Sequence, residues 1–320
     1  MIHSVFRPGG GGLFEGVPPD QFRQAVADRA GVLWVDLQEP SAAERRAVLV
    51  ETFGFQPDFA LEMHRPLRSP TVENHGKYVY IALRAVTGTV GAGDLHTVEL
   101  DCFLGRNYLV TVHDHPTRPL AQVWARAVGD EQLLGQGVAL VLHALLEQLL
   151  DGYRAAVDIL ARSVTRLRTD LLAEPSELTF RSLFDLRRDT VSLQQALQLQ
   201  YELLNQLADV EFPIASSEAH AHFLRTHNLG RALTERLNEL QTATNDLVIT
   251  YLALNTHRLT GTVHSLALMV AVLLSLILVT GVLNIIILAH AAAAGWIIGL
   301  VLALLIVGAV GSIIWLRGKG

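Results

Sequence analysis

The chain has 320 residues, with 25 Lys and Arg against 31 Asp and Glu, and these charges are distributed unevenly. Residues 259–316 contain no Asp, Glu, Lys or Arg, whereas the rest of the chain has the charge density of an ordinary soluble domain. This division excludes a plain cytosolic globule and a disordered chain. The acidic balance of the first 258 residues also offers no basic surface to nucleic acid.

The first 128 residues predict a cytoplasmic α/β domain. Short runs rich in β-branched and aromatic residues indicate strands, at 32–37, 78–86, 98–104 and 108–113. Gly105-Arg106-Asn107 provides turn residues between the last two, which predicts a hairpin. The Gly9–Gly12 run lacks the Lys-Ser/Thr of a phosphate loop, so we expect a hairpin tip there.

Two short helices are expected within this α/β domain. Residues 19–28 begin after a pair of prolines, which is typical of a helix start. Ser41 and Glu44 have the spacing of a capping box, which predicts a helix running toward Phe53.

Residues 129–258 predict a region of long helices. Leu, Ala and Val recur at helical spacing over 138–172 and 178–207, with breaks at 173–176 and 209–217. After the second break we expect one helix from 217 to 284, because Gly230 and Gly261 are isolated and tolerated. Such a helix would join the cytoplasmic part to a membrane as a stalk.

Residues 259–320 predict a membrane domain with two transmembrane helices, at about 265–288 and about 296–315. The connection between them is too short for more than a turn, so both flanks lie on one side of the membrane. The flanks contain basic residues, Arg258 before the first segment and Arg317 and Lys319 after the second, whereas the connection contains no Lys or Arg. The positive-inside rule therefore places the N- and C-termini in the cytoplasm and makes this a multi-pass protein of the cytoplasmic (inner) membrane. A soluble helical bundle is the disfavoured alternative, since neither segment has a polar face.

Several segments resemble the CorA family of divalent-cation channels and its ZntB-like branch, and the resemblance covers essentially the whole chain. The segments are Trp34-Val35-Asp36-Leu37 with Pro40 and Glu44, Arg65-Pro66 through Tyr78-Val79-Tyr80-Ile81, residues 103–113, and Asp151-Gly152-Tyr153. The resemblance implies a CorA-like funnel: an α/β cytoplasmic domain, a long helical stalk and two C-terminal transmembrane helices. It also implies a homopentamer whose first membrane helix lines the pore.

The family signature at the outer pore mouth is Gly-Met-Asn. Counting forward from Asn255, which falls on a family asparagine, places Asn284 on the Asn of that signature. This chain reads Gly281-Val282-Leu283-Asn284, so the Gly is displaced by one position. The resemblance implies a selectivity filter formed by Asn284, Leu283, Val282, Gly281 and Thr280. Amide oxygens suit Mg²⁺, which gives up its water reluctantly; the alternative for Asn284 is a hydrogen bond between helices.

The same ungapped count implies a set of pore-lining residues on one helical face: Val279, Ser275, Val272, Leu268, His264 and Gly261. Leu268 and Val272 would form a hydrophobic gate, or else pack against lipid or a neighbouring helix. Ser275, like Thr280, would contact the water shell of an ion, or else bond to a carbonyl one turn earlier. His264 would contact Zn²⁺ transiently, or else mark the headgroup boundary.

A cytoplasmic metal site is a further hypothesis, because the family is gated by cytoplasmic cation sites between subunits. Glu218, His220 and His222 lie close together at the start of the stalk, with Asp94 as a possible fourth ligand. A pair at His113 and His115 is a weaker candidate. Solvated helix faces are the plainer alternative for all of these residues.

The sequence therefore predicts transport of a divalent cation, of the Mg²⁺, Co²⁺, Ni²⁺ and Zn²⁺ class, through a homopentameric pore. The expected partners are other copies of the chain, the lipid bilayer and divalent cations as substrates and possible regulatory ligands. No covalently bound cofactor and no catalytic residues are expected, so the protein is not predicted to be an enzyme. The alternative is a divergent, poorly conducting CorA-like protein that serves as a membrane-anchored assembly or regulatory subunit. A membrane-tethered enzyme is a third and less favoured reading.

Overall fold

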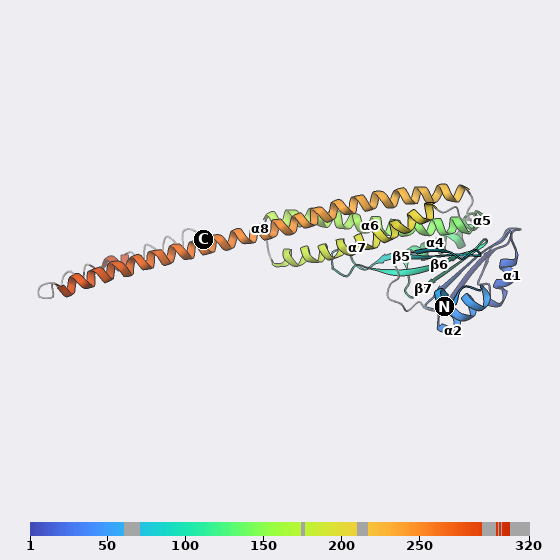
Figure 1. Ribbon diagram of the computed structural model, residues 1–320, viewed down its shortest axis with the longest axis horizontal. Coiled ribbons are helices and arrows are strands. Elements are labelled where there is room, and N and C mark those ends of the chain that lie inside the picture. Colours follow the sequence, from blue (N-terminus) through green and yellow to red (C-terminus); the bar gives the residue numbers. More distant parts are fainter. Residues whose placement is uncertain are drawn as a thin grey trace. The chain divides into compact units, whose positions relative to one another are not determined.

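The computed structural model describes residues 1–60, 71–173, 177–209, 217–289, 299, 301 and 303–307 (Figure 1). The chain divides into two compact units, Met1–Tyr251 and Leu252–Gly320. The first unit contains a mixed sheet covered by helices, and the second contains the continuation of the last long helix. The expected α/β fold with long helices is confirmed.

The described strands of the first unit form one sheet of seven, in the order β2-β1-β3-β7-β6-β5-β4. Strands β3 and β7 are parallel, and the other neighbours are antiparallel. The four strands expected from the sequence are confirmed within two residues at each end, whereas β1, β2 and β4 were not predicted. The bounds are β1 Ile2–Arg7, β2 Phe14–Glu15, β3 Val32–Gln38, β4 Thr71–Asn74, β5 Val79–Thr87, β6 His96–Leu104 and β7 Tyr108–His113.

Both expected hairpin turns are confirmed. The amide of Gly105 donates to the carbonyl of Tyr108 at 2.8 Å and closes the turn between β6 and β7. The glycine run lies between β1 and β2, where the Gly11 amide donates to the Pro8 carbonyl at 3.0 Å. Gly11 and Gly12 both have φ near +87°, which side-chain-bearing residues rarely adopt, so glycine is required there.

One face of the sheet is covered by short elements: η1 Pro19–Gln21, α1 Phe22–Ala27, α2 Ala42–Arg45, η2 Arg46–Thr52 and α3 Pro57–Ala60. The capping box is present, with the Glu44 amide donating to Ser41 Oγ at 3.2 Å. The helix that follows differs from the expected regular one, because from Arg46 it is a π-helix. Its wider turn accompanies the burial of the consecutive residues Val48 and Leu49 in the core.

The opposite face is covered by the longer helices (Figure 1). They are α4 Arg118–Gly129, α5 Glu131–Gly135, α6 Val138–Ala173, α7 Glu177–Asp209 and α8 Ser217–Ala289. The three long helices expected from the sequence are confirmed, and α8 runs five residues past the expected end at Asn284. Residues 174–176 and 210–216, where we expected breaks, lie outside the described residues.

Two buried contacts hold the long helices to the sheet. Trp34 of β3 packs on Trp124 of α4 with ring centroids 4.8 Å apart. The carboxylate of Asp189, on α7, accepts backbone hydrogen bonds from Gly91, Gly93 and Leu95 in the β5–β6 loop at 2.6, 3.2 and 3.4 Å. These contacts stabilise the packing of α4 and α7 against the sheet within the first unit.

Candidate pore and ion-binding residues

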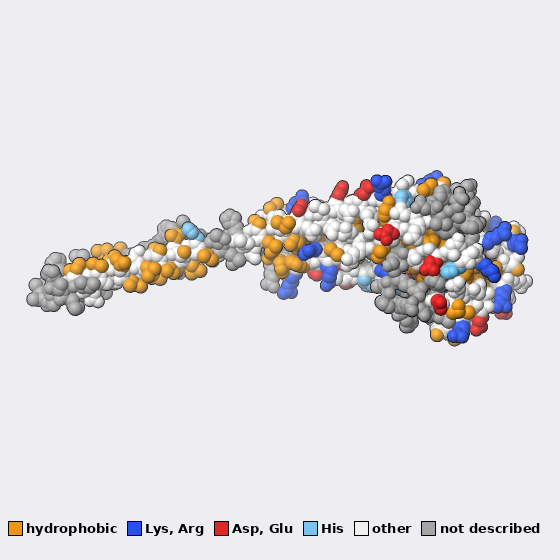
Figure 2. All heavy atoms as spheres, viewed as in Figure 1, with side chains coloured by type: hydrophobic (Ala, Val, Ile, Leu, Met, Phe, Trp, Pro, Cys, Tyr) orange, Lys and Arg blue, Asp and Glu red, His pale blue; other side chains and the backbone are white. Residues whose placement is uncertain are grey.

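The second unit contains a helix that can cross a membrane. Thr262–Asn284 is the segment of the described chain that is long and apolar enough, with a mean hydropathy of 2.9 over its most apolar window and no residue of that window buried. Figure 2 shows hydrophobic side chains along this helix. Of the expected second span, the structure describes residues 299, 301 and 303–307, all helical; the rest of it and residues 290–298 lie outside the described residues.

One face of this helix packs against the described part of the second segment. Leu276, Thr280, Leu283 and Ile287 are partly buried at spacings of four, three and four, as are Val301 and Leu305 opposite them. A hollow of about 550 Å³ lies between the two segments, and its lining is apolar except for Ser275 and Thr280. The described part of the second segment therefore covers a narrow strip of the membrane-spanning helix.

The residues expected to line a pore remain accessible in the single chain. Leu268, Val272, Ser275 and Val279 border the hollow and stay exposed, Val279 to 53%. At about 100° per residue they lie roughly a quarter turn from the packed strip. His264 is exposed on the same helix, whereas Gly261 is placed on α8 by its backbone alone.

The expected filter residues all lie within α8 rather than beyond its end. Asn284 is exposed, and Leu283 points partly toward the second segment. Nine positions separate Ser275 from Asn284, which is two and a half turns of a regular helix at about 3.6 residues per turn. The two polar side chains therefore lie on opposite sides of α8. Val282 and Ile286, by the same geometry, continue the face of Ser275.

The two hydroxyl groups in the span bond to their own helix. Ser275 Oγ donates to the Ala271 carbonyl at 2.8 Å. Thr280 Oγ1 lies 2.9 Å from the carbonyls of both Leu276 and Ile277. This back-bonding is the alternative that we considered for both residues. Their oxygens keep free lone pairs, so each can still accept a hydrogen bond from a water in the shell of an ion.

The residues expected to form a metal site outside the membrane do not form one in the described part of the chain. Within it, no three side chains of His, Cys, Asp or Glu converge to hold a metal ion. His222 packs its ring against that of His143 on α6, 4.8 Å away, while Asp94 Oδ1 accepts the Thr89 amide at 2.9 Å within the β5–β6 loop. Glu218 and His220 lie on α8, but their side chains are outside the described residues, so the complete set stays a prediction.

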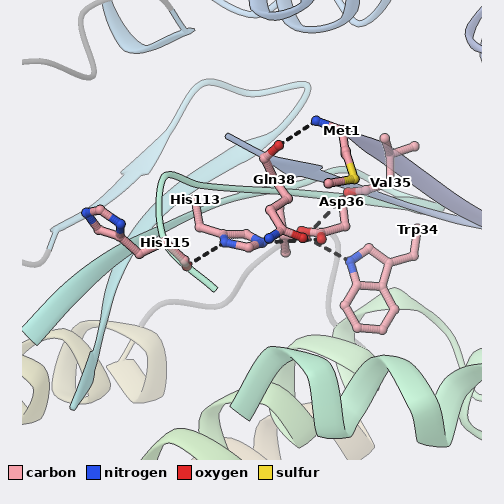
Figure 3. A network of polar contacts seen from close by, with 8 residues as sticks. Met1, Trp34, Val35, Asp36, Gln38, His113 and His115 are labelled. Carbon is pink, nitrogen blue, oxygen red and sulfur yellow. Dashed lines mark hydrogen bonds and ion pairs between the residues drawn. The ribbon is translucent and has the colours of Figure 1, made fainter. Parts of the chain in front are cut away.

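A buried polar network links the ends of β3 and β7 (Figure 3). Asp36 and His113 come together because the two strands are parallel, with Nε2 of His113 3.3 Å from Oδ2 of Asp36. The other ring nitrogen of His113 is 2.7 Å from the His115 carbonyl. Thr111 donates to Asp36 at 2.6 Å and accepts from the Trp34 indole at 3.2 Å. Since both His113 nitrogens face acceptors, the geometry favours the doubly protonated ring.

His113 and His143 are both buried, and burial alone lowers the pKa of each, but the groups around the two rings differ. Burial lowers the pKa of His113, yet the hydrogen bond and the charge of Asp36 outweigh it, so the pKa ends above its ordinary value. Burial also lowers the pKa of His143, and there Glu147 does not compensate, so that pKa stays below its ordinary value. The fold thus favours the charged form of the first ring and the neutral form of the second.

Comparison with known families decides what this architecture belongs to. The family described as CorA-like Mg²⁺ transporter protein matches residues 29–317. The chain belongs to this family. It is thus a member of a family of divalent-metal membrane transporters, and not an enzyme.

Individual relatives agree with the placement of this CorA-like chain. The putative metal ion transporter YfjQ of Bacillus subtilis (strain 168) is 24% identical over 249 residues, which are 78% of this chain and 76% of that protein. The complete CorA magnesium transporter of Methanocaldococcus jannaschii has a similar fold, with a TM-score of 0.76 at 16% identity over 99% of this chain and 98% of that one. The cytoplasmic domain of ZntB from Vibrio parahaemolyticus gives 0.61 at 11% identity, over 80% of this chain and 99% of that one.

The sequence alone did not identify the two main polar networks of this CorA-like protein. Asp36 and His113 are 77 positions apart, and Asp189 lies 94 or more positions from the amides that it binds. Asp36 and His113 stand in apolar stretches, which is a weak signal for a buried partner, whereas Asp189 follows Arg187 and Arg188 and looks like part of a charged helix surface. The pairing of β3 with β7 was needed to join the first set.

Proposed function

We propose that several copies of this chain, most simply five, surround an axis and carry a divalent cation across the cytoplasmic membrane. Both termini would lie in the cytoplasm and the second membrane segment would face lipid. The observation that carries the proposal is the face of Leu268, Val272, Ser275 and Val279. It lies clear of the packed strip within one chain, and it needs other copies around it to enclose a path.

The chemistry of that face favours an ion that keeps its water. The path would be apolar except for Ser275, so it offers few ligands that can replace a hydration shell. Mg²⁺ dehydrates reluctantly, whereas Zn²⁺ and Ni²⁺ bind imidazole and would gain from His264 at the cytoplasmic end. The cation is the substrate and no resident cofactor is proposed. Residues 285–295 include no carboxylate to concentrate cations at the outer mouth.

The alternative function is a poorly conducting assembly or regulatory protein of the same architecture. It is favoured by the regular course of α8, which puts Val282 and Ile286 on the face of Ser275 and turns Asn284 to the other side. An apolar mouth of this kind would dewet and oppose ion entry. Conduction with Asn284 as the filter requires the helix to end or rotate before residue 284 in the assembled state.

Ion flux into liposomes distinguishes the two functions. The intact protein is reconstituted, and uptake of Mg²⁺, Co²⁺, Ni²⁺ and Zn²⁺ is followed separately with an entrapped indicator. We expect uptake that falls at least about tenfold in Asn284→Ala, as one lost filter interaction of about 1.4 kcal/mol or more would give. Leu278→Ala, exposed on the same helix and outside the expected pore residues, is the matched control. Absence of flux from assembled wild-type protein would favour the alternative.

A further inference from the structure

A small hollow lies at the carboxyl ends of β3 and β7, the two parallel strands of the sheet. Strand β3 continues into α2 and η2 on one face of the sheet, whereas β7 continues into α4 on the opposite face. In open α/β sheets such a divergence leaves a crevice outside the strand ends, and ligands bind there. The hollow measures about 190 Å³ and has the sheet on one side and α4 on the other.

The strand pairing places polar side chains on the sheet side of this hollow. Asp36 is the register partner of His3 in β1 and of Thr111 in β7, and Gln38 is the partner of His113. Direct partners, and residues two positions apart in a strand, present their side chains to the same face. Four side chains of this set border the hollow, those of His3, Asp36, Gln38 and His113.

The other side of the hollow contributes a hydroxyl group without a partner. Thr117 is the N-cap residue of α4, borders the hollow and is 5% exposed. An N-cap threonine ordinarily accepts a hydrogen bond from an amide of the first turn. Here the side chain caps no amide, and its Oγ1 has no hydrogen-bond partner among the described residues. A buried hydroxyl in this state costs free energy, so a molecule that bonds to it would be favoured.

Charge and size restrict what the hollow can take. Asp36 and His113 neutralise each other as an ion pair, so a charged molecule beside them would be buried without compensation. These two and His3, which is exposed, do not converge on a metal ion, because no such group of three occurs in the described part of the chain. A cavity of about 150 Å³ holds a benzene ring. The hollow therefore has room for one ring with a small substituent.

We propose that this hollow binds a small uncharged molecule of one ring that presents adjacent N–H and C=O groups, as a cyclic amide does. The N–H donates to Asp36, whose carboxylate oxygens accept one bond each within the protein and have capacity for more. The C=O accepts from the Thr117 hydroxyl. Leu120 and Trp124, which also border the hollow, supply apolar contact for the ring. The inference concerns the first unit alone and does not depend on ion conduction.

Saturation-transfer NMR of the full-length protein in detergent, near neutral pH, tests this site with four one-ring probes. 2-Pyridone has the N–H and C=O groups, and N-methyl-2-pyridone, which lacks the N–H, is its matched control. Benzoate and N-methylpyridinium each add a charge. We expect 2-pyridone to bind at least about tenfold more tightly than its N-methyl analogue, which leaves Asp36 without the donor. The two charged probes should give no signal.

Two substitutions locate the binding in this hollow. Thr117→Val replaces the hydroxyl by a methyl group of similar size and should weaken 2-pyridone binding several-fold. Ala121→Phe adds a ring at the border of the hollow and should abolish the binding. Ala125→Phe, exposed one turn further along α4 and not bordering the hollow, is the control for that variant and should bind as the wild type does. Unfolding transitions measured in parallel show whether each variant is folded.

The comparison of probes uses the wild-type chain, so it decides the proposal even if a variant fails to fold. Absence of 2-pyridone binding, or equal binding of the two pyridones, would overturn it. Binding that survives both Thr117→Val and Ala121→Phe would also overturn it, since the site would then lie elsewhere. Tighter binding of a charged probe would do the same, because the hollow would then take an ion.

Discussion

Asp36 and His113 form an ion pair in the interior of the first unit. Ionisable side chains are rarely buried in this way. Asp36 is 6% exposed and His113 is 3% exposed, and they border a hollow of about 190 Å³. Removing one partner of such a pair leaves the other charge buried without compensation, which costs about 3 kcal/mol or more. The pair therefore makes the fold sensitive to the charge of one imidazole.

This pair predicts a stability that depends on pH in a definite direction. Because the folded pKa of His113 is raised above its ordinary 6.5, its stabilising contribution is complete below pH 6.5 and is lost as the pH rises through the folded pKa. The free energy of unfolding of the wild type should therefore exceed that of His113→Gln by about 3 kcal/mol at acid pH. The gap should shrink as the pH rises.

Thermal unfolding of the two proteins between about pH 5.5 and about pH 8.5 measures this gap. His115→Gln is the control, because its backbone carbonyl, not its side chain, accepts from His113. A gap that stays constant or widens toward alkaline pH would show that the imidazolium is not stabilised in the fold.

At the scale of the elements, the β5–β6 loop is tied to α7 through a single side chain. The Asp189 carboxylate is 1% exposed and accepts three amides of this loop. Gly93 is required at its position, since φ is +70° and an added Cβ would lie 2.2 Å from the Arg188 guanidinium. Hydrogen bonds to one buried carboxylate therefore help to hold the loop against α7.

Asp189→Ala should release this loop from α7 without unfolding the sheet. Leaving three amides, one buried and two partly buried, without an acceptor costs about 2 kcal/mol, after partial hydration. Hydrogen exchange of residues 89–95 should accelerate at least about tenfold, while exchange in β3 and β7 stays as in the wild type. Asp170→Asn, exposed on α6, is the comparison variant. Unchanged exchange in the loop would mean that the sheet and the turn alone hold it.

How far each element could be predicted depended on how local its signal was. Strands β3, β5, β6 and β7 each contain a run rich in apolar, β-branched or aromatic residues, and the Ser41 capping box is read from four consecutive residues. Strand β1 alternates only weakly between apolar and polar residues, and β2 is two residues long. Neither strand therefore has a sequence pattern that distinguishes it from the residues around it. The π-helix at Arg46–Thr52 has the same composition as an α-helix, and its wider turn is a consequence of packing.

At the scale of the whole molecule, the membrane-spanning helix was predictable and its orientation was not. Fifty-eight residues without a strong acid or base identify a membrane domain from composition alone. The direction in which Asn284 points depends on the helix continuing to Ala289, and the family signature, with its displaced glycine, gave no sign of that. A side chain on a lone helix has no fixed environment until other copies surround it.

Assembly therefore provides the last prediction, which identifies the face of α8 that meets the axis. If the face of Ser275 lines the path, Ser275→Cys on neighbouring copies should approach closely enough to form disulfides under a mild oxidant. Ile277→Cys, 65% exposed and two positions along, lies on the opposite side of the helix and should stay monomeric on a denaturing gel. The native cysteine is fully buried and should not contribute. The opposite pattern, with Ile277 or Asn284 cross-linked and Ser275 not, would move the axis to the side of Asn284 and favour that residue as the filter.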